Sequence, residues 1–301
     1  MMWKSLSLSL LSFAMLASAA IAEPGGVVSP AEILAGSTAS EWRPIDPENT
    51  LYLELPAGRV VIELNPRIAP INVARIKSLV RAGTLDKAVV ERAQQNYVVQ
   101  WGLPDGDRAR GDPFRPRAAA LKDEFETVVS APFDVLPDPD AFAPQTGISE
   151  GFPAGRDPAS GVTWLAHCYG MVGVARGNGP DSADGTEMYA VAGHSPRHLD
   201  RNITLVGRVI QGMNLLAAMP FGTGDLGFYL AKSEQTPVRR IQMASDLPPQ
   251  QRLRLEALRS DSSTWRMLLE SRRNRREPWF VRPAGRIDLC NAPLPVRVAA
   301  P

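Results

Sequence analysis

The sequence has few of the residues that usually bind metals. It contains two cysteines and three histidines in 301 residues, and His167, Cys168, His194 and His198 lack the close ligand spacing of a metal site. We therefore expect no metal. A phosphate loop is also missing, because the glycine-rich stretch GNGPDSADG (177–185) lacks the Gly-Lys-Ser/Thr ending and is typical of a surface turn.

An excess of charge of one sign is likewise missing. The chain carries 33 basic and 32 acidic side chains, a net charge of +1, and removal of Lys4 with the N-terminal segment would bring this to zero. A neutral chain exerts no global attraction on nucleic acid or anionic lipid, so we expect no nucleic-acid partner. The run RRNRR (272–276) is typical of a solvated helix end, where cations suit the dipole; an acidic partner is the alternative.

Only one long apolar stretch is present, and it lies at the N-terminus. Residues 1–22 combine Lys4, an apolar and Ser-rich centre, and small residues at Ala20 and Ala22, which is the pattern of a cleaved secretory signal peptide. The apolar part is short for a membrane span, and no cysteine follows it to accept a lipid. We expect a periplasmic or secreted mature chain without a membrane span; an uncleaved anchor is the alternative.

The two cysteines, Cys168 and Cys290, have one way to pair. In an oxidising, exported compartment this pairing would close a loop of over a hundred residues. By the chain-entropy estimate such a disulfide stabilises the folded state by about 4–5 kcal/mol, less any strain. The alternative is two unrelated buried thiols.

Alternation of apolar and polar residues predicts several strands. TLYLELPAGRVVIEL (50–64) predicts a hairpin around a Pro-Ala-Gly turn, and further strands are expected at 87–92, 96–101, 163–165, 170–176, 186–193, 202–210 and 238–244. Residues 65–83 follow a helical period that ends at Gly83, and a short helix is expected over 211–219. The apolar stripe of the first helix would comprise Ile71, Ala74, Ile76, Leu79 and Val80.

Two regions differ in character. Residues 104–160 contain nine prolines and many glycines, which leaves little room for regular elements and predicts a long surface excursion. In 246–301, the stretches 248–259 and 262–276 predict two helices, with short strands in WFVRP and GRIDLC. The expected division is a signal peptide (1–22), a lead-in (23–49), a strand-rich domain (50–245) with an insertion (104–160), and a C-terminal extension (246–301).

The order of these elements resembles that of the cyclophilins, which are peptidyl-prolyl cis–trans isomerases. GRVVIELNPRIAPINVARIKSLVRAG (58–83) is similar to the family's opening strand pair and first helix, and GRVIQGMNLLAAM (207–219) to its penultimate strand and second helix. The resemblance covers about 50–103 and 163–244. It implies a mainly β fold, a closed eight-stranded antiparallel barrel capped by two helices, here with a long insertion and a helical extension.

The resemblance also implies a peptide-binding site. The family's Phe-His-Arg motif corresponds to Val90-Glu91-Arg92, which keeps only the arginine, and its Phe-Met-x-Gln motif to Tyr97-Val98-Val99-Gln100. Its Gly-Ser-Gln-Phe-Phe motif corresponds to residues 185–189, its Trp-Leu-Asp motif to 198–200, and a later pocket histidine to Ile203. Arg92 is then the implied catalytic residue. The implied substrate-binding residues are Tyr97, Val98, Gln100, Ala175, Glu187, Met188, Tyr189, His198 and Leu199.

The implied reaction needs no nucleophile, proton transfer or cofactor. Rotation about an X–Pro bond is slow because amide resonance must be broken, a barrier of roughly 18–20 kcal/mol. A guanidinium near the proline nitrogen can donate to the lone pair that localises on rotation, and so favours the twisted state. We expect Arg92 to act in this way on proline-containing segments of unfolded or exported proteins.

Three alternatives remain open. The changes at Glu91, His198 and Ile203 favour a peptide-binding module or chaperone with little or no catalysis. Arg92 has a structural alternative as a barrel-rim arginine paired with a carboxylate such as Glu187. Finally, GISEG (147–151) matches the Gly-x-Ser-x-Gly motif of hydrolases, but no strand-then-helix context is predicted around Ser149.

Overall fold

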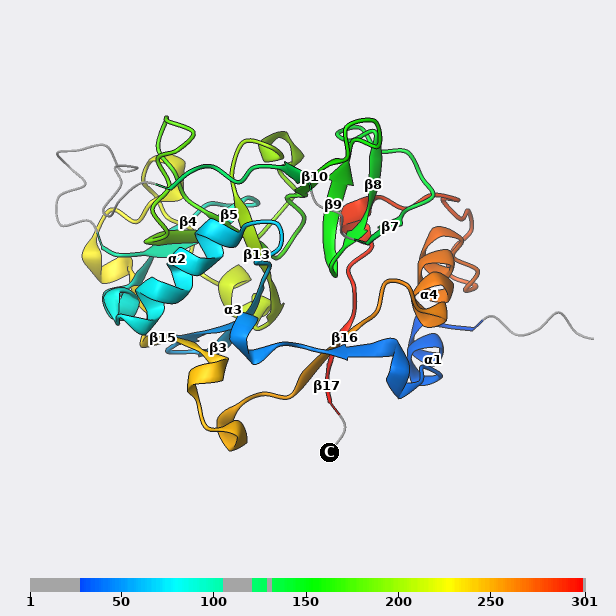
Figure 1. Ribbon diagram of the computed structural model, residues 1–301, viewed down its shortest axis with the longest axis horizontal. Helices are drawn as coiled ribbons and strands as arrows, with labels where there is room; N and C mark the ends of the chain where they lie inside the picture. Colours follow the sequence, from blue (N-terminus) through cyan, green and yellow to red (C-terminus); the bar gives the residue numbers. More distant parts are fainter. Residues whose placement is uncertain (1–27, 105–120, 129–131, 300–301) are drawn as a thin grey trace, which may run out of the picture.

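The computed structural model describes residues 28–104, 121–128 and 132–299. The predicted signal peptide (1–22) lies outside the described residues. Figure 1 shows a curled sheet towards one end of the long axis, and a second group of elements, including α1, α4 and β7–β9, towards the other. Within the described ranges, no helix is both long enough and apolar enough to cross a bilayer.

The main sheet has nine antiparallel strands in the order β14-β4-β5-β12-β11-β13-β3-β2-β15. The hairpin predicted at 50–64 is confirmed. The strands are β2 (Thr50–Leu55), β3 (Gly58–Leu64), β4 (Val89–Ala93), β5 (Val98–Gly102), β11 (Met171–Val174), β12 (Glu187–Val191), β13 (Leu205–Gln211), β14 (Thr236–Pro237) and β15 (Arg240–Met243).

This sheet differs from the predicted closed eight-stranded barrel, because nine strands form a curled sheet with two edges. Both edges belong to one stretch of chain, in which only Val238 and Arg239 separate β14 from β15. Val238 N–H donates to Ala88 O at 2.9 Å, and Arg239 N–H donates to Glu54 O at 2.8 Å. The stretch therefore changes partner between Val238 and Arg239, from the strand β4 at one edge of the sheet to β2 near the other.

Two helices, α2 (Pro70–Arg81) and α3 (Met213–Ala217), accompany the sheet. The predicted apolar stripe of α2 is partly wrong, because Ile71 is 44 % exposed and Ala74 is also exposed. The buried face instead comprises Asn72, Val73, Ile76 and Val80. The buried residues recur with the helical period that was predicted. They are different residues because the helix begins at Pro70 and turns another side towards the sheet.

The insertion is far more regular than predicted. It contributes to a five-stranded antiparallel sheet in the order β6-β10-β9-β8-β7, made of β6 (Thr127–Val128), β7 (Phe133–Val135), β8 (Gln145–Ser149), β9 (Phe152–Arg156) and β10 (Val162–Leu165). Glu150 and Gly151 both have positive φ, +52° and +88°, and form the tight turn between β8 and β9. Ser149 is thus followed by a second strand, which is not the strand-then-helix context of a hydrolase nucleophile.

The lead-in and the extension form a third sheet in the order β1-β16-β17. Its strands are β1 (Trp42–Pro44), β16 (Leu255–Leu258) and β17 (Val296–Val298). The helix predicted at 248–259 is therefore wrong: Leu255 and Ala257 are buried and Glu256 is half-buried, which is the alternation of a strand. The second predicted helix is confirmed as α4 (Ser263–Arg273), whereas WFVRP and GRIDLC form no strand.

A second core joins the outer face of the main sheet to the other elements. Cys168 and Met171 of the main domain pack in one cluster with Phe152 of β9, Trp265 of α4 and Ile33 of α1 (Pro30–Ala35). The predicted disulfide is confirmed, because Cys168 is bonded to Cys290 across 122 residues of sequence. The extension is thereby fixed to the main sheet both by packing and by a covalent bond.

Candidate active site

Arg92, Gln100 and Tyr189 form a row across three neighbouring strands. Arg92 of β4 pairs in register with Gln100 of β5, and Gln100 pairs with Tyr189 of β12. Side chains alternate between the two faces along a strand, and the neighbouring Val99 and Met188 belong to the core inside the sheet. The row therefore lies on the outer face.

Gln100 connects the arginine to two buried carboxylates. Its Oε1 accepts from Arg92 Nη1 at 3.2 Å, and its Nε2 lies 3.3 Å from Glu91 Oε1 and 3.3 Å from Glu187 Oε2. Glu91 faces this side because the pairing of β4 with β5 shifts register between Val90 and Arg92, as in a β-bulge. The amide, an acceptor on one side and a donor on the other, thus stands between the guanidinium and Glu187.

The segment after α3 covers the other side of Arg92. The Arg92 Nε donates to the carbonyl of Leu226 at 2.7 Å, and Nη2 donates to Gln94 Oε1. The guanidinium carbon lies 5.2 Å from the centre of the Phe228 ring and 5.8 Å from that of Tyr97, within the range of cation–π attraction. Arg92 is consequently only 8 % exposed and is held in one orientation.

Apolar side chains extend from the row on the side of β12. Val98 and Tyr189 are buried in the second core, and Tyr97 and Ile203 are half-buried against it. Burial raises the pKa of the Tyr97 hydroxyl, and the nearby Arg92 charge opposes that rise. Tyr97 and Ile203 thus keep part of their apolar surface exposed, whereas Val98 is 3 % and Tyr189 is 5 % exposed.

The other residues predicted for the site lie outside the row. Met188 lies on the inner face of the sheet, opposite to the row, because it alternates with Glu187 and Tyr189. His198 is exposed and Leu199 is half-buried on a short 3₁₀ helix, Arg197–Leu199. Ala175 follows β11, where its N–H donates to Glu187 O at 3.0 Å.

The position of Tyr189 depends on a glycine in the next strand. Gly173 of β11 pairs with Tyr189, and a Cβ built on Gly173 would lie 2.3 Å from the Tyr189 hydroxyl oxygen. No real side chain tolerates such a distance, so any larger residue at 173 would displace the ring. The tyrosine ring therefore lies across β11 in space that only glycine leaves open.

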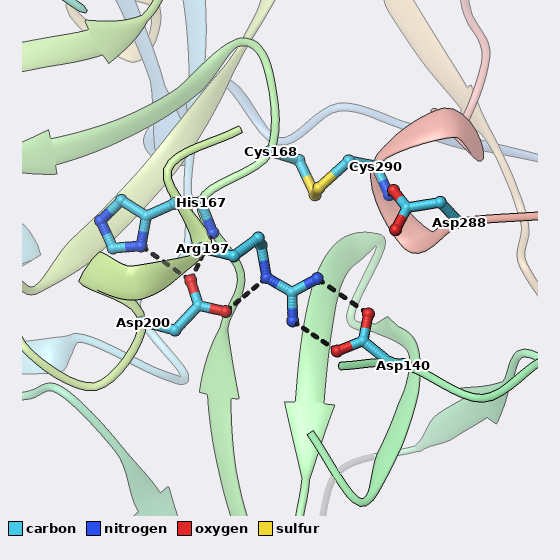
Figure 2. Close-up of a disulfide and its surroundings, with 7 residues drawn as sticks. All are labelled: Asp140, His167, Cys168, Arg197, Asp200, Asp288 and Cys290. Carbon is cyan, nitrogen blue, oxygen red and sulfur yellow. Dashed lines mark hydrogen bonds and ion pairs between the residues drawn. A yellow bond between two sulfur atoms is a disulfide. The ribbon is translucent and has the colours of Figure 1, made fainter. Parts of the chain in front are cut away.

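A buried polar network holds the far end of this ring. His167 Nε2 lies 2.9 Å from the Tyr189 hydroxyl, and His167 Nδ1 lies 2.9 Å from Asp200 Oδ1. Figure 2 shows that Asp200 also contacts Arg197, whose two terminal nitrogens meet both oxygens of Asp140 at 3.0 and 3.1 Å. The network thus runs from the row to the insertion.

The charge states follow from burial. Burial lowers the pKa of His167, which Asp200 opposes, so the imidazole is neutral. With its Nδ1 proton donated to Asp200, Nε2 accepts the Tyr189 hydroxyl hydrogen. Burial also raises the pKa of Tyr189 strongly, which keeps that hydrogen in place. For Arg197, burial alone would lower the pKa, but Asp200 and Asp140 outweigh it and raise the pKa.

Sequence reasoning missed several of these contacts. Gln94 and Phe228 hold Arg92, but the only sequence signal for the covering segment is its glycines, such as Gly227, whose Cβ would lie 2.7 Å from the Gln94 Cα. The sequence pattern presents His167 only as a possible metal ligand. Nothing in the sequence links His167 to Asp200 or Asp140, because these residues meet only through the fold.

Two cavities lie apart from the row, beside the C-terminal extension. One, of about 190 Å³, is lined in part by the Cys168–Cys290 disulfide and Met171. The other, of about 490 Å³, is lined in part by Arg43 and Glu63, which form an ion pair at 2.7 Å. Neither cavity contains Arg92, Gln100 or Tyr189, the residues that the resemblance to cyclophilins implies, so the row remains the candidate site.

Comparison with known proteins identifies similar proteins that isomerise prolyl peptide bonds, the reaction that the sequence resemblance implies for this site. The family model described as "Cyclophilin type peptidyl-prolyl cis-trans isomerase/CLD" matches residues 50–245, which is well over half of the chain. The chain therefore belongs to the cyclophilin-type peptidyl-prolyl cis–trans isomerase family.

Similar proteins include probable peptidyl-prolyl cis-trans isomerases of Brucella suis biovar 1 and Brucella abortus strain 2308. Each is 27 % identical over 179 residues, which are 59 % of this chain and 74 % of the relative. Among solved structures, cyclophilin AquaCyp293 from Hirschia baltica superposes with a TM-score of 0.67 at 24 % identity, over 91 % of this chain and 99 % of that chain. The likeness in fold thus extends beyond the segment that the family model matches.

Proposed function

We propose that Arg92 catalyses the cis–trans isomerisation of X–Pro bonds without covalent chemistry. The observation that carries the proposal is the row itself, in which a held guanidinium lies 5.8 Å from the half-buried Tyr97 ring and shares the outer face of the sheet with Val98 and Tyr189. As the bond twists, its nitrogen becomes pyramidal and its lone pair localises. A donor already fixed at that position favours the twisted state over both planar states.

In this geometry the Arg92 guanidinium is already held in a fixed orientation before a substrate binds. Contacts with Leu226 O and Gln94, together with the amide of Gln100, hold the guanidinium in its plane, so little reorganisation is required during the reaction. Arginine suits this role because it remains charged and presents its donors in a rigid fork. The network from His167 to Asp140 serves to position the Tyr189 ring and touches no reacting atom.

The proposed substrates are proline-containing segments of unfolded proteins outside the cytoplasm. Two observations support export: the signal-like N-terminal sequence and the Cys168–Cys290 disulfide, since disulfides persist mainly in oxidising compartments. In this role the protein would assist folding in the periplasm or after secretion. No cofactor takes part in the proposed step.

The test compares the wild type with Arg92→Ala and Arg92→Lys in a protease-free assay on a proline peptide. Removing a preorganised donor typically lowers catalysis by about 100-fold or more, so we expect a loss of that order in kcat/KM for Arg92→Ala. Arg92→Lys keeps the charge but loses the planar fork, and should recover only part of the rate. Arg239→Ala, at an exposed arginine between β14 and β15, is the matched control and should retain full activity.

Peptide binding measured on the same variants separates a catalytic role from a binding role. We expect the Kd for the proline peptide to change only a few-fold in Arg92→Ala, since the proposed contact strengthens in the transition state. If Arg92→Ala matches the wild type in rate, the role assigned to Arg92 is wrong.

One observation favours a second candidate, a peptide-binding module with weak catalysis. Arg92 is 8 % exposed beneath the segment that contains Leu226 and Phe228, and Tyr189 is 5 % exposed, so a peptide has limited access to both. A wild-type rate at background, with proline-peptide binding retained, would establish this candidate and exclude the enzyme.

A further inference from the structure

The end of α4 and the segment that follows it are unlike the rest of the surface. Residues 272–286, here the arginine–tryptophan loop, contain six arginines and one carboxylate, Glu277, a local net charge of +5 in a chain whose total is +1. Asp138 and Glu270, which pair with Arg273, reduce the local excess only to +3. Positive charge is therefore concentrated in one place on a nearly neutral molecule.

Two large apolar side chains project from the same loop. Trp279 is 81 % exposed and Val281 is 90 % exposed. Phe280 between them is half-buried, with the Arg275 guanidinium 5.2 Å from its ring centre and the Trp279 ring at 4.9 Å in an edge-to-face arrangement. Phe280 thus holds the loop, while its two neighbours point away from the protein.

Half of the arginines are available to a partner. Arg273 is bound by Asp138, Arg272 donates to the carbonyl of Pro293, and Arg275 lies 3.7 Å from Glu277. Within the described part of the chain, Arg276, Arg282 and Arg286 form no ion pair. These three are exposed and flank Trp279 and Val281 in sequence, so positive charge outside ion pairs coincides with exposed apolar surface.

We infer that the arginine–tryptophan loop binds the surface of a lipid bilayer that carries anionic headgroups. Arginines near such a surface are attracted by its negative potential, and tryptophan prefers the headgroup region, where its ring is apolar and its N–H remains hydrated. The two effects act together in peripheral membrane proteins.

The shape of the loop favours a bilayer over an acidic protein. Side chains exposed by 81 % and 90 % would need matching pockets on a protein partner, whereas a bilayer accommodates them without a preformed shape. The position is also suitable: α4 lies at the opposite end of the long axis from α2 and β4 (Figure 1). A molecule held by this loop would keep the Arg92 row away from the lipid.

Tryptophan fluorescence offers a direct test on the chain without residues 1–22. Four of its tryptophans, Trp42, Trp101, Trp164 and Trp265, are at most 7 % exposed, so Trp279 should dominate any response to vesicles. We expect a blue shift and co-sedimentation with phosphatidylcholine vesicles that contain about one third phosphatidylglycerol, and neither with pure phosphatidylcholine. Trp279→Phe should abolish the shift but retain part of the sedimentation.

Charge neutralisation tests the arginines. The triple variant Arg276→Gln/Arg282→Gln/Arg286→Gln should bind the anionic vesicles at least tenfold more weakly, since each basic residue near the surface contributes about fivefold. The matched control is Arg239→Gln/Arg240→Gln/Arg254→Gln, which removes the same charge from exposed positions elsewhere and should bind like the wild type. Thermal midpoints of both variants verify that they fold.

Two outcomes would overturn the proposal. One is equal loss of binding in the loop variant and the control, which would indicate attraction by total charge alone. The other is no binding to anionic vesicles together with binding of soluble poly-glutamate that requires the loop arginines, which would identify an acidic polypeptide as the partner.

Discussion

At the residue scale, Gln100 links the cation of the candidate site to its two buried carboxylates. Its carbonyl oxygen faces Arg92 and its amino group faces Glu91 and Glu187. A carboxylate in its place could not donate to the two glutamates, and an apolar side chain could serve neither partner. Glutamine is thus the residue type that fits between a cation and two anions.

The variant Gln100→Leu should be clearly destabilised. It removes a hydrogen-bond partner from Arg92 and from two buried carboxylates, and loss of partners of this kind costs about 1–3 kcal/mol. Urea denaturation gives the free energy of unfolding. Gln242→Leu is the matched control, since the half-buried Gln242 of β15 has an Oε1 without a hydrogen bond among the described residues; a similar loss in both variants would contradict the role given to Gln100.

His167 should make stability depend on pH in a specific direction. Its pKa is lowered in the folded protein by burial, so as the pH falls the unfolded chain takes up a proton near the ordinary histidine pKa of about 6.5, while the folded protein does not. The contribution of His167 is therefore fully present above that pH and is lost as pH falls below it.

Between pH 7.5 and 5.5, the wild type should lose thermal stability more steeply than His167→Gln, which cannot titrate. The Tm of both proteins across this range tests the prediction, and parallel curves would refute it. As a positioning residue for Tyr189, His167 should also affect KM for a proline peptide more than kcat.

The site was predictable from the sequence only where it is local. Arg92, Tyr97, Val98 and Gln100 lie within one hairpin, on β4, β5 and the turn between them, so a short stretch of sequence contains their motif and spacing. Contacts from Leu226, Phe228 and the His167 network come from distant segments, and their positions depend on packing that no single stretch determines. Met188 was misplaced because the phase of the strand, not its composition, decides which face a residue occupies.

At the element scale, predictions succeeded where hydrophobic period was clear. The hairpin of β2 and β3 and the helix α2 were expected from alternation and from helical spacing. β8 and β9 were missed because their prolines and glycines mask a hairpin whose signal is the Glu150–Gly151 turn. β16 was read as helix because LRLEAL satisfies both periods, and its partners β1 and β17 lie far away in sequence.

The Cys168–Cys290 disulfide joins the extension to the main sheet and should contribute strongly to stability. Cys168→Ser/Cys290→Ser should lower the free energy of unfolding by about 4–5 kcal/mol, from loop-closure entropy over the 122-residue separation. Urea denaturation of the wild type with and without reductant gives the same comparison, and the double variant should not respond to reductant. A loss below about 1 kcal/mol would show that packing alone fixes the extension.

At the scale of the whole molecule, one core unites segments that the sequence separates. Ile33 from the lead-in, Phe152 from the insertion, Tyr189 from the main sheet and Trp265 from α4 belong to the same cluster. The family-like segment therefore shares its outer surface with the lead-in and the extension. Their common packing makes separate unfolding of the extension unfavourable.

Truncation of Trp265 should destabilise the entire protein in a single step. Trp265 is 2 % exposed, and replacing a buried tryptophan by alanine typically costs about 3–5 kcal/mol. Far-UV circular dichroism and isomerase activity should report the same lowered midpoint. Met267→Ala, at an exposed site on the same helix, should cost less than about 0.5 kcal/mol; two separate transitions in Trp265→Ala would contradict the shared core.

The meeting of β14 and β15 on one stretch of chain also bears on self-association. The exposed edge of a sheet can recruit another chain as an extra strand. Here the two edge strands, β14 and β15, have two and four residues, and β14 ends at a proline. Such short edge strands offer little template for the addition of further strands, so the sheet should resist edge-to-edge aggregation of the protein with itself.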